Sequence, residues 1–215
     1  MPILYLDNTV LFPGTTLVAK FNDNKSIQVI NYCIQNNLPL LIQLYPIIGK
    51  NISYGTVAKI HHNSLKFDKK TNVVQIILEG TSRAKVNQII QHIPYTIAEV
   101  EFKHENHGES IISNNKISKI KSLIENWANN EVKNSKDREK FITKLDSFPR
   151  IINYACFLLI RDPELQELLL ESDSLTKRFQ LLSNILLENR KQFDQTEFLV
   201  ALKNFADVPK SNICH

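Results

Sequence analysis

The sequence predicts an α+β protein in which a strand-rich part comes first and a helical part follows. Up to about residue 103, apolar residues alternate or form short continuous runs, as is typical of strands. Beyond the polar stretch 104–108, the apolar residues recur about every 3.6 positions, as is typical of helices. With 215 residues, 43% of them hydrophobic, the chain can build a sizeable core. We therefore predict a β-rich subdomain over residues 1–107 and a helical bundle over residues 108–215.

Five apolar runs predict strands in the first part. Residues 38–45 are almost continuously apolar up to Pro46, so we expect a strand buried on both faces. The run from residue 73 is expected to end at Gly80. In the last run, Ala98, Val100 and Phe102 are predicted to share one face. The polar stretch 68–72 predicts a hairpin loop. The runs are residues 3–6, 38–45, 73–78, 83–90 and 96–103.

One helix is predicted within the strand-rich part. The side chains of residues 22–24 (Asn-Asp-Asn) can cap its first turn, and Ile27, Ile30 and Ile34 then lie on one face. Asn36, Asn37 and Pro39 are expected to end it. Many strands with one helix, and with Gly and Pro at the corners, fit a small barrel or a folded sheet.

The helical part divides at polar or proline-containing starts. Ser135, Ser147 and Asp162 each stand where a helix is expected to begin, and Pro149 and Pro163 suit first-turn positions. The apolar stripes, in chain order, are Ile117, Ile120, Ile124 and Trp127; then Ile151, Tyr154, Ala155, Leu158 and Leu159; then Leu175, Phe179, Leu182 and Leu186. The helix after Ser135 is expected to run to about Leu145, one after Asp162 covers residues 164–171, and a short one is predicted over 196–205.

Charge and hydropathy exclude several classes of protein. The net charge is +4, divided as +3 up to Asn106 and +1 beyond it, without a concentrated basic block. Nucleic-acid binding is therefore disfavoured, and Lys66, Lys69 and Lys70 are interpreted as a solvated hairpin tip. No apolar run reaches the length of a membrane span, and no signal peptide precedes residues 3–6. We expect a cytoplasmic protein with free thiols.

The sequence contains no recognisable catalytic or cofactor-binding motif. The spacing of the five glycines excludes the common nucleotide-binding loops, so no cofactor is expected. His104 and His107, with Glu105 between them, are the best metal candidates, but this stretch is interpreted as a linker and no metal site is predicted. The side chains of His61 and His62 would point to opposite faces of a strand. We interpret Glu99 and Glu101 as a solvated strand face, Cys33 and Cys156 as core residues, Trp127 as core and Cys214 as part of a tail.

A series of short motifs resembles the N-terminal, substrate-binding domain of Lon proteases. The opening NTVLFPG (residues 8–14) is similar to the start of that domain, and the segments 24–27, 54–60, 78–86 and 166–179 match later motifs in family order. The resemblance implies a PUA-like β pseudobarrel followed by a helical bundle. Phe179 departs from the leucine that the family has after the arginine matched by Arg178. The residues that the resemblance marks as structural are Phe12, Pro13, Gly14, Gly55, Glu79, Gly80 and Arg83.

The resemblance also implies a non-catalytic function. Lon proteases carry an ATPase and a peptidase module after this domain, and the present sequence, which ends at His215, shows neither. We therefore expect a non-catalytic protein-binding module that binds unfolded or apolar segments of proteins, or acts as an adaptor for a Lon-type protease. Its binding surface is expected to be an apolar patch or a groove between the two subdomains. The family also assembles, so homodimerisation is a further expectation.

RNA binding is the alternative interpretation. The PUA fold occurs in RNA-modifying proteins, and the chain is mildly basic. Against this interpretation stand the even distribution of charge and the lack of interleaved basic and aromatic residues. Salt distinguishes the two, because RNA binding weakens steeply with salt and apolar binding does not.

Overall fold

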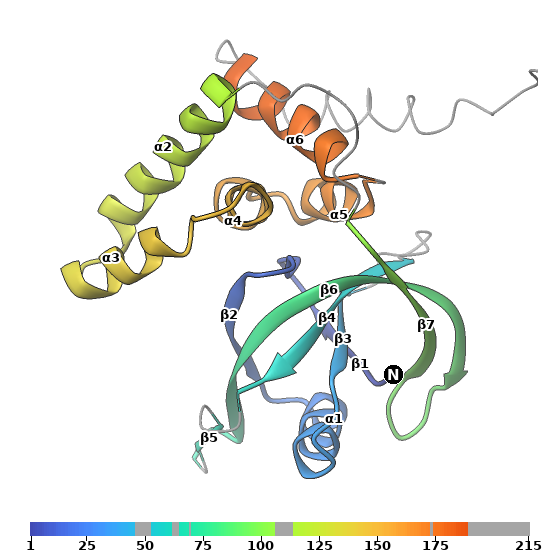
Figure 1. Cartoon of the computed structure of the whole chain (residues 1–215). Helices are drawn as coiled ribbons and strands as arrows, with labels where there is room; N and C mark the ends of the chain where they lie inside the picture. Colours follow the sequence, from blue (N-terminus) through green and yellow to red (C-terminus); the bar gives the residue numbers. More distant parts are fainter. Residues whose placement is uncertain (46–52, 62–64, 69, 106–113, 173, 189–215) are drawn as a thin grey trace, which may run out of the picture.

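The computed structural model describes residues 1–45, 53–61, 65–68, 70–105, 114–172 and 174–188. Strands come first and helices follow, as predicted (Figure 1). The strands are β1 (Ile3–Leu6), β2 (Thr16–Phe21), β3 (Leu40–Leu44), β4 (Tyr54–Ile60), β5 (Lys66–Asp68), β6 (Val73–Gln91) and β7 (Ile97–Lys103). The helices are α1 (Asn24–Gln35), α2 (Asn114–Glu131), α3 (Ser135–Thr143), α4 (Phe148–Leu159), α5 (Pro163–Glu171) and α6 (Leu175–Ser183), and a π-helical turn, η2 (Asn184–Glu188), follows α6.

The strands form one mixed sheet that curls into a pseudobarrel. The path runs β1-β3-β4-β6-β2, and β5 and β7 also pair with β6. Strands β1 and β3 are parallel, and the other pairs are antiparallel. Helices α2 to α6 lie together at one end of the sheet, and α1 lies at the other (Figure 1). The α+β class and the pseudobarrel followed by helices are therefore confirmed.

The prediction that a strand ends at Gly80 is wrong, because β6 runs without a break from Val73 to Gln91. Opposite it, β4 pairs Val57 with Ser82 and Ala58 with Gly80, so Thr81 is an extra residue in the ladder. Such a bulge increases the local twist and bends the strand. The long strand thereby pairs with β2 and β5 near its beginning, with β4 over residues 78–85 and with β7 over residues 83–91.

Strand β3 is buried along its whole length, as its apolar run predicts. Leu40 and Ile42 point into the core shared with α1, and Leu41 points into a smaller core beside β7. Ala98 and Phe102 lie on the same face of the unbroken strand β7, as predicted, but Ala98 is fully buried whereas Phe102 is 53% exposed. Phe102 lies opposite Ala84 near the end of the β6–β7 ladder, and the described residues do not cover it.

Helix α1 begins and ends where its sequence indicates. The side chain of Asp23 accepts a hydrogen bond from the Ser26 amide at 2.8 Å, and Asn36 is the C-cap. Ile30 and Cys33 are buried against the sheet, in agreement with the prediction for Cys33. The helix therefore covers one opening of the pseudobarrel.

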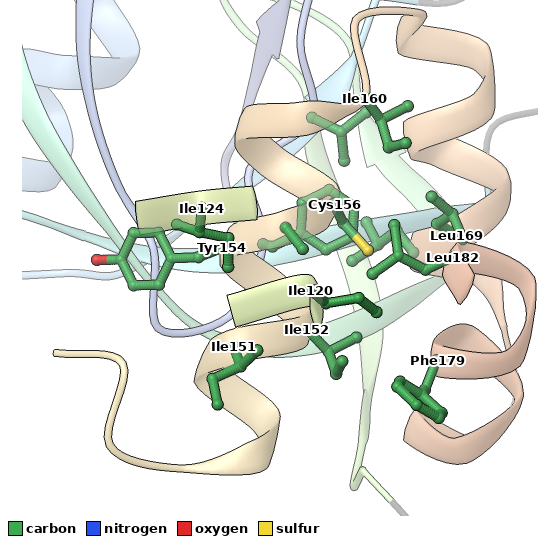
Figure 2. Close-up of a cluster of buried hydrophobic side chains, with 14 of the residues drawn as sticks. Ile120, Ile124, Ile151, Ile152, Tyr154, Cys156, Ile160, Leu169, Phe179 and Leu182 are labelled. Atoms are coloured by element: carbon green, nitrogen blue, oxygen red, sulfur yellow. The ribbon is translucent and has the colours of Figure 1, made fainter. Parts of the chain in front are cut away.

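The helices share a core to which the strand-rich part also contributes. Figure 2 shows Ile120 and Ile124 of α2 facing Ile152 and Cys156 of α4, with Leu182 of α6 beside them. Trp127 is half-buried, 6.0 Å from the ring of Phe141. Val10, Phe12 and Leu44 extend the same cluster toward the sheet. This shared core fixes the helices on the sheet.

Three details of the helices differ from the predictions. Asn134, rather than Ser135, caps α3. Ser147 stands at the N-cap of α4, but its side chain makes no cap hydrogen bond. The last predicted stripe does not lie within one α-helix, because α6 ends at Ser183 and Leu186 lies half-buried in the π-helical turn.

The predicted helix over 196–205 and the subdomain boundary at 107/108 lie outside the described residues, so both stay predictions. None of the described helices combines the length and the apolar character that a membrane span requires.

Candidate functional site

The opening motif forms the junction between the sheet and the helices. Phe12 is fully buried in the core that α2, α4, α5 and α6 share. The carbonyl of Pro13 accepts a 3.0 Å hydrogen bond from Asn153 of α4. The amide of Val10 donates at 2.9 Å to the side chain of Gln166 on α5. The segment between β1 and β2 thus connects two helices to the sheet by buried polar contacts.

Two glycines of the motifs allow this segment to lie against the sheet. Gly14 has a φ of +75°, which disfavours other residues. A Cβ on Gly80 would lie 2.3 Å from the Phe12 carbonyl oxygen, so only glycine fits there without displacement. Gly55 on β4 is similarly close to β3, where a Cβ would lie 2.6 Å from the Ile42 carbonyl oxygen.

Arg83 of β6 is a buried connector between the sheet and α5. It is 2% exposed, and its Nη1 donates to the carbonyls of Leu170 at 2.6 Å and Ser172 at 2.5 Å. Its Nε lies 3.7 Å from Glu105, which also accepts a 2.6 Å hydrogen bond from Arg178. Arg178 is fully buried, and its guanidinium carbon lies 5.8 Å from the ring centre of Phe12. Two arginines from different parts of the chain therefore share one carboxylate.

Glu79 lies away from this junction. Its side chain is 49% exposed and 3.1 Å from His61, which is equally exposed. Phe12, Pro13, Gly14, Gly80 and Arg83 meet at the interface with the helices, whereas Gly55 lies between β3 and β4. The contacts of these positions explain how the fold is held together.

The other candidates from the sequence fall on separate surfaces or in the core. His104 is exposed, and His107, His62 and Cys214 lie outside the described residues. Glu99 and Glu101 are exposed on β7, as predicted. Cys33 and Cys156 are buried free thiols, also as predicted. Among the residues that the structure describes, no three His, Cys, Asp or Glu side chains gather as metal ligands would.

A hollow bordered by strands, a helix and aromatic rings lies beside β1. It has a volume of about 480 Å³ and is bounded by β1, the end of β2, the first turns of α1, and Tyr45 and Tyr95. We call it the β1 groove. It separates the two strands, β1 and β2, that end the main path of the sheet. The groove is therefore the place where the pseudobarrel remains open.

Aromatic rings border the β1 groove. Tyr5 and Tyr45 pack edge to face with ring centres 5.7 Å apart, and Tyr45 is 58% exposed. Tyr95 lies 5.4 Å from Tyr32 of α1. Burial raises the pKa of the Tyr5 phenol, and its hydrogen bond with Thr96 opposes this shift. The Tyr5 phenol is thus neutral at physiological pH, and the rings around the groove offer apolar faces with hydrogen-bonding edges.

A second hollow, of about 340 Å³, lies between the strands and helices, where the sequence-based expectation placed a groove. The charged side chains that line it already pair with other side chains of the protein. Arg83 and Glu105 take part in the shared contact, and Arg150 bonds Asp146 at 3.0 Å. The β1 groove lacks such a network and is the better candidate for an apolar ligand.

Comparison with known proteins decides the family. Residues 1–188 match the model of the "ATP-dependent protease La (LON) substrate-binding domain". The chain belongs to this family. It is also 21% identical, over 206 residues, to a Lon protease of Acinetobacter baumannii. The match covers 91% of this chain and 25% of that protease, so the chain spans about a quarter of the length of its curated relative.

Solved structures agree on the fold of this Lon-family chain. A Lon N-terminal domain protein from Xanthomonas campestris matches with a TM-score of 0.62 and 17% identity, over 85% of this chain and 95% of that one. The N-terminal domain of a Lon protease from the Mycobacterium avium complex matches with a TM-score of 0.64 and 16% identity, over 88% and 98%. These similarities concern the fold, and the family assignment identifies a substrate-recognition module.

Sequence reasoning did not identify the β1 groove. Its aromatic border comes from Tyr5, Tyr45 and Tyr95, which are distant in the sequence and belong to no common motif. The available signal was the short strand at residues 3–6, which has polar residues directly after it. Only the path of the sheet shows that one edge of this strand remains open.

Proposed function

We propose that this protein is a non-catalytic module that binds unfolded, apolar segments of other proteins. The observation that carries the proposal is the β1 groove, a hollow bordered by tyrosines at the open side of a Lon substrate-binding fold. Its four nearest charged side chains, Asp7, Lys20, Asp23 and Lys25, cancel in sum. A neutral, partly apolar hollow favours uncharged chain segments over nucleic acid.

The absence of catalysis is part of the same proposal. The thiols of Cys33 and Cys156 lie in the core, where burial raises the pKa of each, to about 11 and about 12. Neither thiol is therefore a reactive nucleophile. The same free thiols support the cytoplasm as the predicted compartment.

The direct test is binding of an unfolded client. A small protein kept unfolded by reduction and carboxymethylation is labelled, and its fluorescence anisotropy is measured on titration with this chain. The folded, oxidised form of the same protein is the matched control. We expect micromolar binding of the unfolded form, no binding of the folded form, and little change between 50 mM and 500 mM salt.

Two results would contradict the proposal. Equal binding of the folded and unfolded forms, or no binding of either, would exclude recognition of unfolded segments. Tight binding of single-stranded RNA that weakens steeply over the same salt range would favour the RNA interpretation instead.

We further propose that the bound segment is passed to a Lon-type protease, so that the protein acts as an adaptor. The family supports this role, because its domain recognises the substrates of such proteases. Adding the chain to a Lon-type protease with the carboxymethylated client should increase the rate of degradation. A rate that is unchanged, or that falls by simple competition, would exclude the adaptor role and leave client binding intact.

A further inference from the structure

One edge of β1 carries backbone groups without partners. The carbonyls of Pro2 and Leu6 accept hydrogen bonds from Leu41 and Tyr45 of the β3 side, at 2.8 and 2.7 Å. Backbone groups of successive strand residues point to opposite edges. Ile3 and Tyr5 therefore direct their N–H and C=O groups away from β3 and toward the β1 groove.

The chain itself occupies only the beginning of this edge. Pro2 forms an antiparallel bridge with Ile97, the Ile3 amide donates to Thr96 at 3.0 Å, and the Ala98 amide donates to Met1 at 2.9 Å. The preceding residues bend away at 93–95. Within the described part of the chain, the C=O of Ile3 and both backbone groups of Tyr5 have no hydrogen-bond partner.

The open part of this edge faces the β1 groove. The β1 groove takes in residues 3–7, and its opposite wall is formed by Phe21 and the first turns of α1. Four strand residues span about 13 Å at a rise of about 3.3 Å each. The groove therefore offers length for a short extended segment, with the Tyr5 N–H and the C=O groups of Ile3 and Tyr5 available along one wall.

We propose that an extended segment of a client protein binds in the β1 groove by adding an antiparallel strand to the open edge of β1. The inference rests on the proposed function and specifies how a client is recognised. The incoming segment continues the ladder that Thr96 and Ile97 begin. Its amide and carbonyl groups bond the Tyr5 C=O and N–H, and its side chains contact Tyr45 and Tyr95.

Strand addition selects unfolded clients by their free backbone groups and requires no specific amino-acid sequence. Every polypeptide offers the same backbone groups, but a folded protein has already paired most of its own. Two lysines and two aspartates around the groove leave no net charge, so a neutral segment with alternating apolar side chains is the complementary occupant. The open part of the edge has one N–H and two C=O groups without partners in the described chain, so binding is weak and reversible.

Hydrogen exchange at single amides tests the geometry. The full chain is labelled with ¹⁵N, and the exchange of the Tyr5 amide is followed by NMR with and without an eight-residue peptide of alternating valine and threonine with terminal lysines. We expect exchange at Tyr5 to slow at least tenfold in the complex. The amides of Leu4 and Leu6, which face β3, should not change.

The matched control changes the peptide and leaves the protein intact. The same peptide, N-methylated at its four central residues, retains its side chains but loses the amide donors. It should bind at least tenfold more weakly. Equal affinity of the two peptides would overturn strand addition.

The carboxymethylated client separates this inference from the proposed function. A client that binds and slows exchange at Tyr5 supports both. A client that binds without any effect at Tyr5 overturns strand addition and leaves the proposed function standing. A client that does not bind overturns the proposed function itself.

Two further results of the same experiment would also overturn strand addition by a client. Slow exchange at Tyr5 in the dilute free protein would show that the edge is already paired within the chain. Exchange that slows as the concentration of the protein alone rises would identify a second copy of this chain as the occupant.

Discussion

Arg178 on α6 donates a hydrogen bond of 2.6 Å from its Nη1 to the Oε1 of Glu105, which follows β7. The same carboxylate lies 3.7 Å from the Nε of Arg83 on β6. The two arginines are 0% and 2% exposed, and Glu105 is 18% exposed. Glu105 is thus the shared counter-charge at the contact between the sheet and the helices.

Replacing this carboxylate should weaken the fold. We expect Glu105→Gln to lower the free energy of unfolding by about 2–3 kcal/mol, because two buried guanidinium groups lose their shared negative charge. Urea denaturation followed by circular dichroism measures the change. Glu101→Gln is the control, because Glu101 bonds Lys103 on an exposed strand face and should have little effect. Equal losses in both variants would argue against a special role for the buried charge.

Gly80 should tolerate no side chain. In Gly80→Ala the new Cβ would meet the backbone oxygen of Phe12, and neither backbone can move without displacing the buried phenyl ring. A loss of about 2–3 kcal/mol in unfolding free energy is expected. Gly14→Ala should cost less, about 1 kcal/mol, because its Cβ meets only the flexible Arg150 side chain and the strain comes from φ alone. If the order of the two losses were reversed, the close approach at Gly80 would not limit stability.

Local sequence patterns predicted the elements whose burial follows from a simple period. The continuous apolar run of β3 and the capped amphipathic helix α1 are examples, since each pattern has one arrangement that buries it. The misplaced end at Gly80 shows the limit. A glycine that permits close approach of a neighbouring segment cannot be distinguished, by sequence alone, from one that ends a strand.

The candidate site could not be predicted for a related reason. An open strand edge is a property of the sheet order, and the order depends on pairing between distant segments. The sequence around Tyr5 is the same whether or not a neighbour covers it. Likewise, Arg178 is typical of an exposed helical residue by its type. Its complete burial is explained by partners that are distant in the sequence, Glu105 and Asn153, and by the nearby Leu169 carbonyl.

The two buried thiols should resist alkylation in the native protein. Burial raises the pKa of Cys33 to about 11 and of Cys156 to about 12, so both remain protonated at pH 8. Reaction with iodoacetamide at pH 8 should be at least tenfold slower in the native state than in urea. Mass spectrometry of the peptides that contain each cysteine measures this ratio site by site. Equal rates in the native state and in urea would place these thiols at the surface.

The same thiols should make stability fall at high pH. Their folded-state pKa values exceed those of the unfolded chain, so the unfolded state loses protons first as the pH rises above about 9. Stability is therefore fully present below pH 9 and is lost toward pH 11–12, by about 1.4 kcal/mol per pH unit for each thiol. Urea midpoints at pH 8, 9 and 10 test the slope, and Cys156→Ala should reduce it. An identical slope in that variant would assign the effect to other groups, such as the tyrosines.

Tyr45 should contribute directly to client binding. It is 58% exposed at the border of the β1 groove, where its ring packs against Tyr5. We expect Tyr45→Ala to weaken binding of the carboxymethylated client about tenfold, because an aromatic contact in an interface contributes about 1–2 kcal/mol. Phe67→Ala is the matched control, since Phe67 is 52% exposed on β5 and does not line the groove. Anisotropy titrations of both variants decide the point. A loss of affinity for Phe67→Ala equal to that for Tyr45→Ala would indicate diffuse apolar binding over the surface and would remove the β1 groove as the client site.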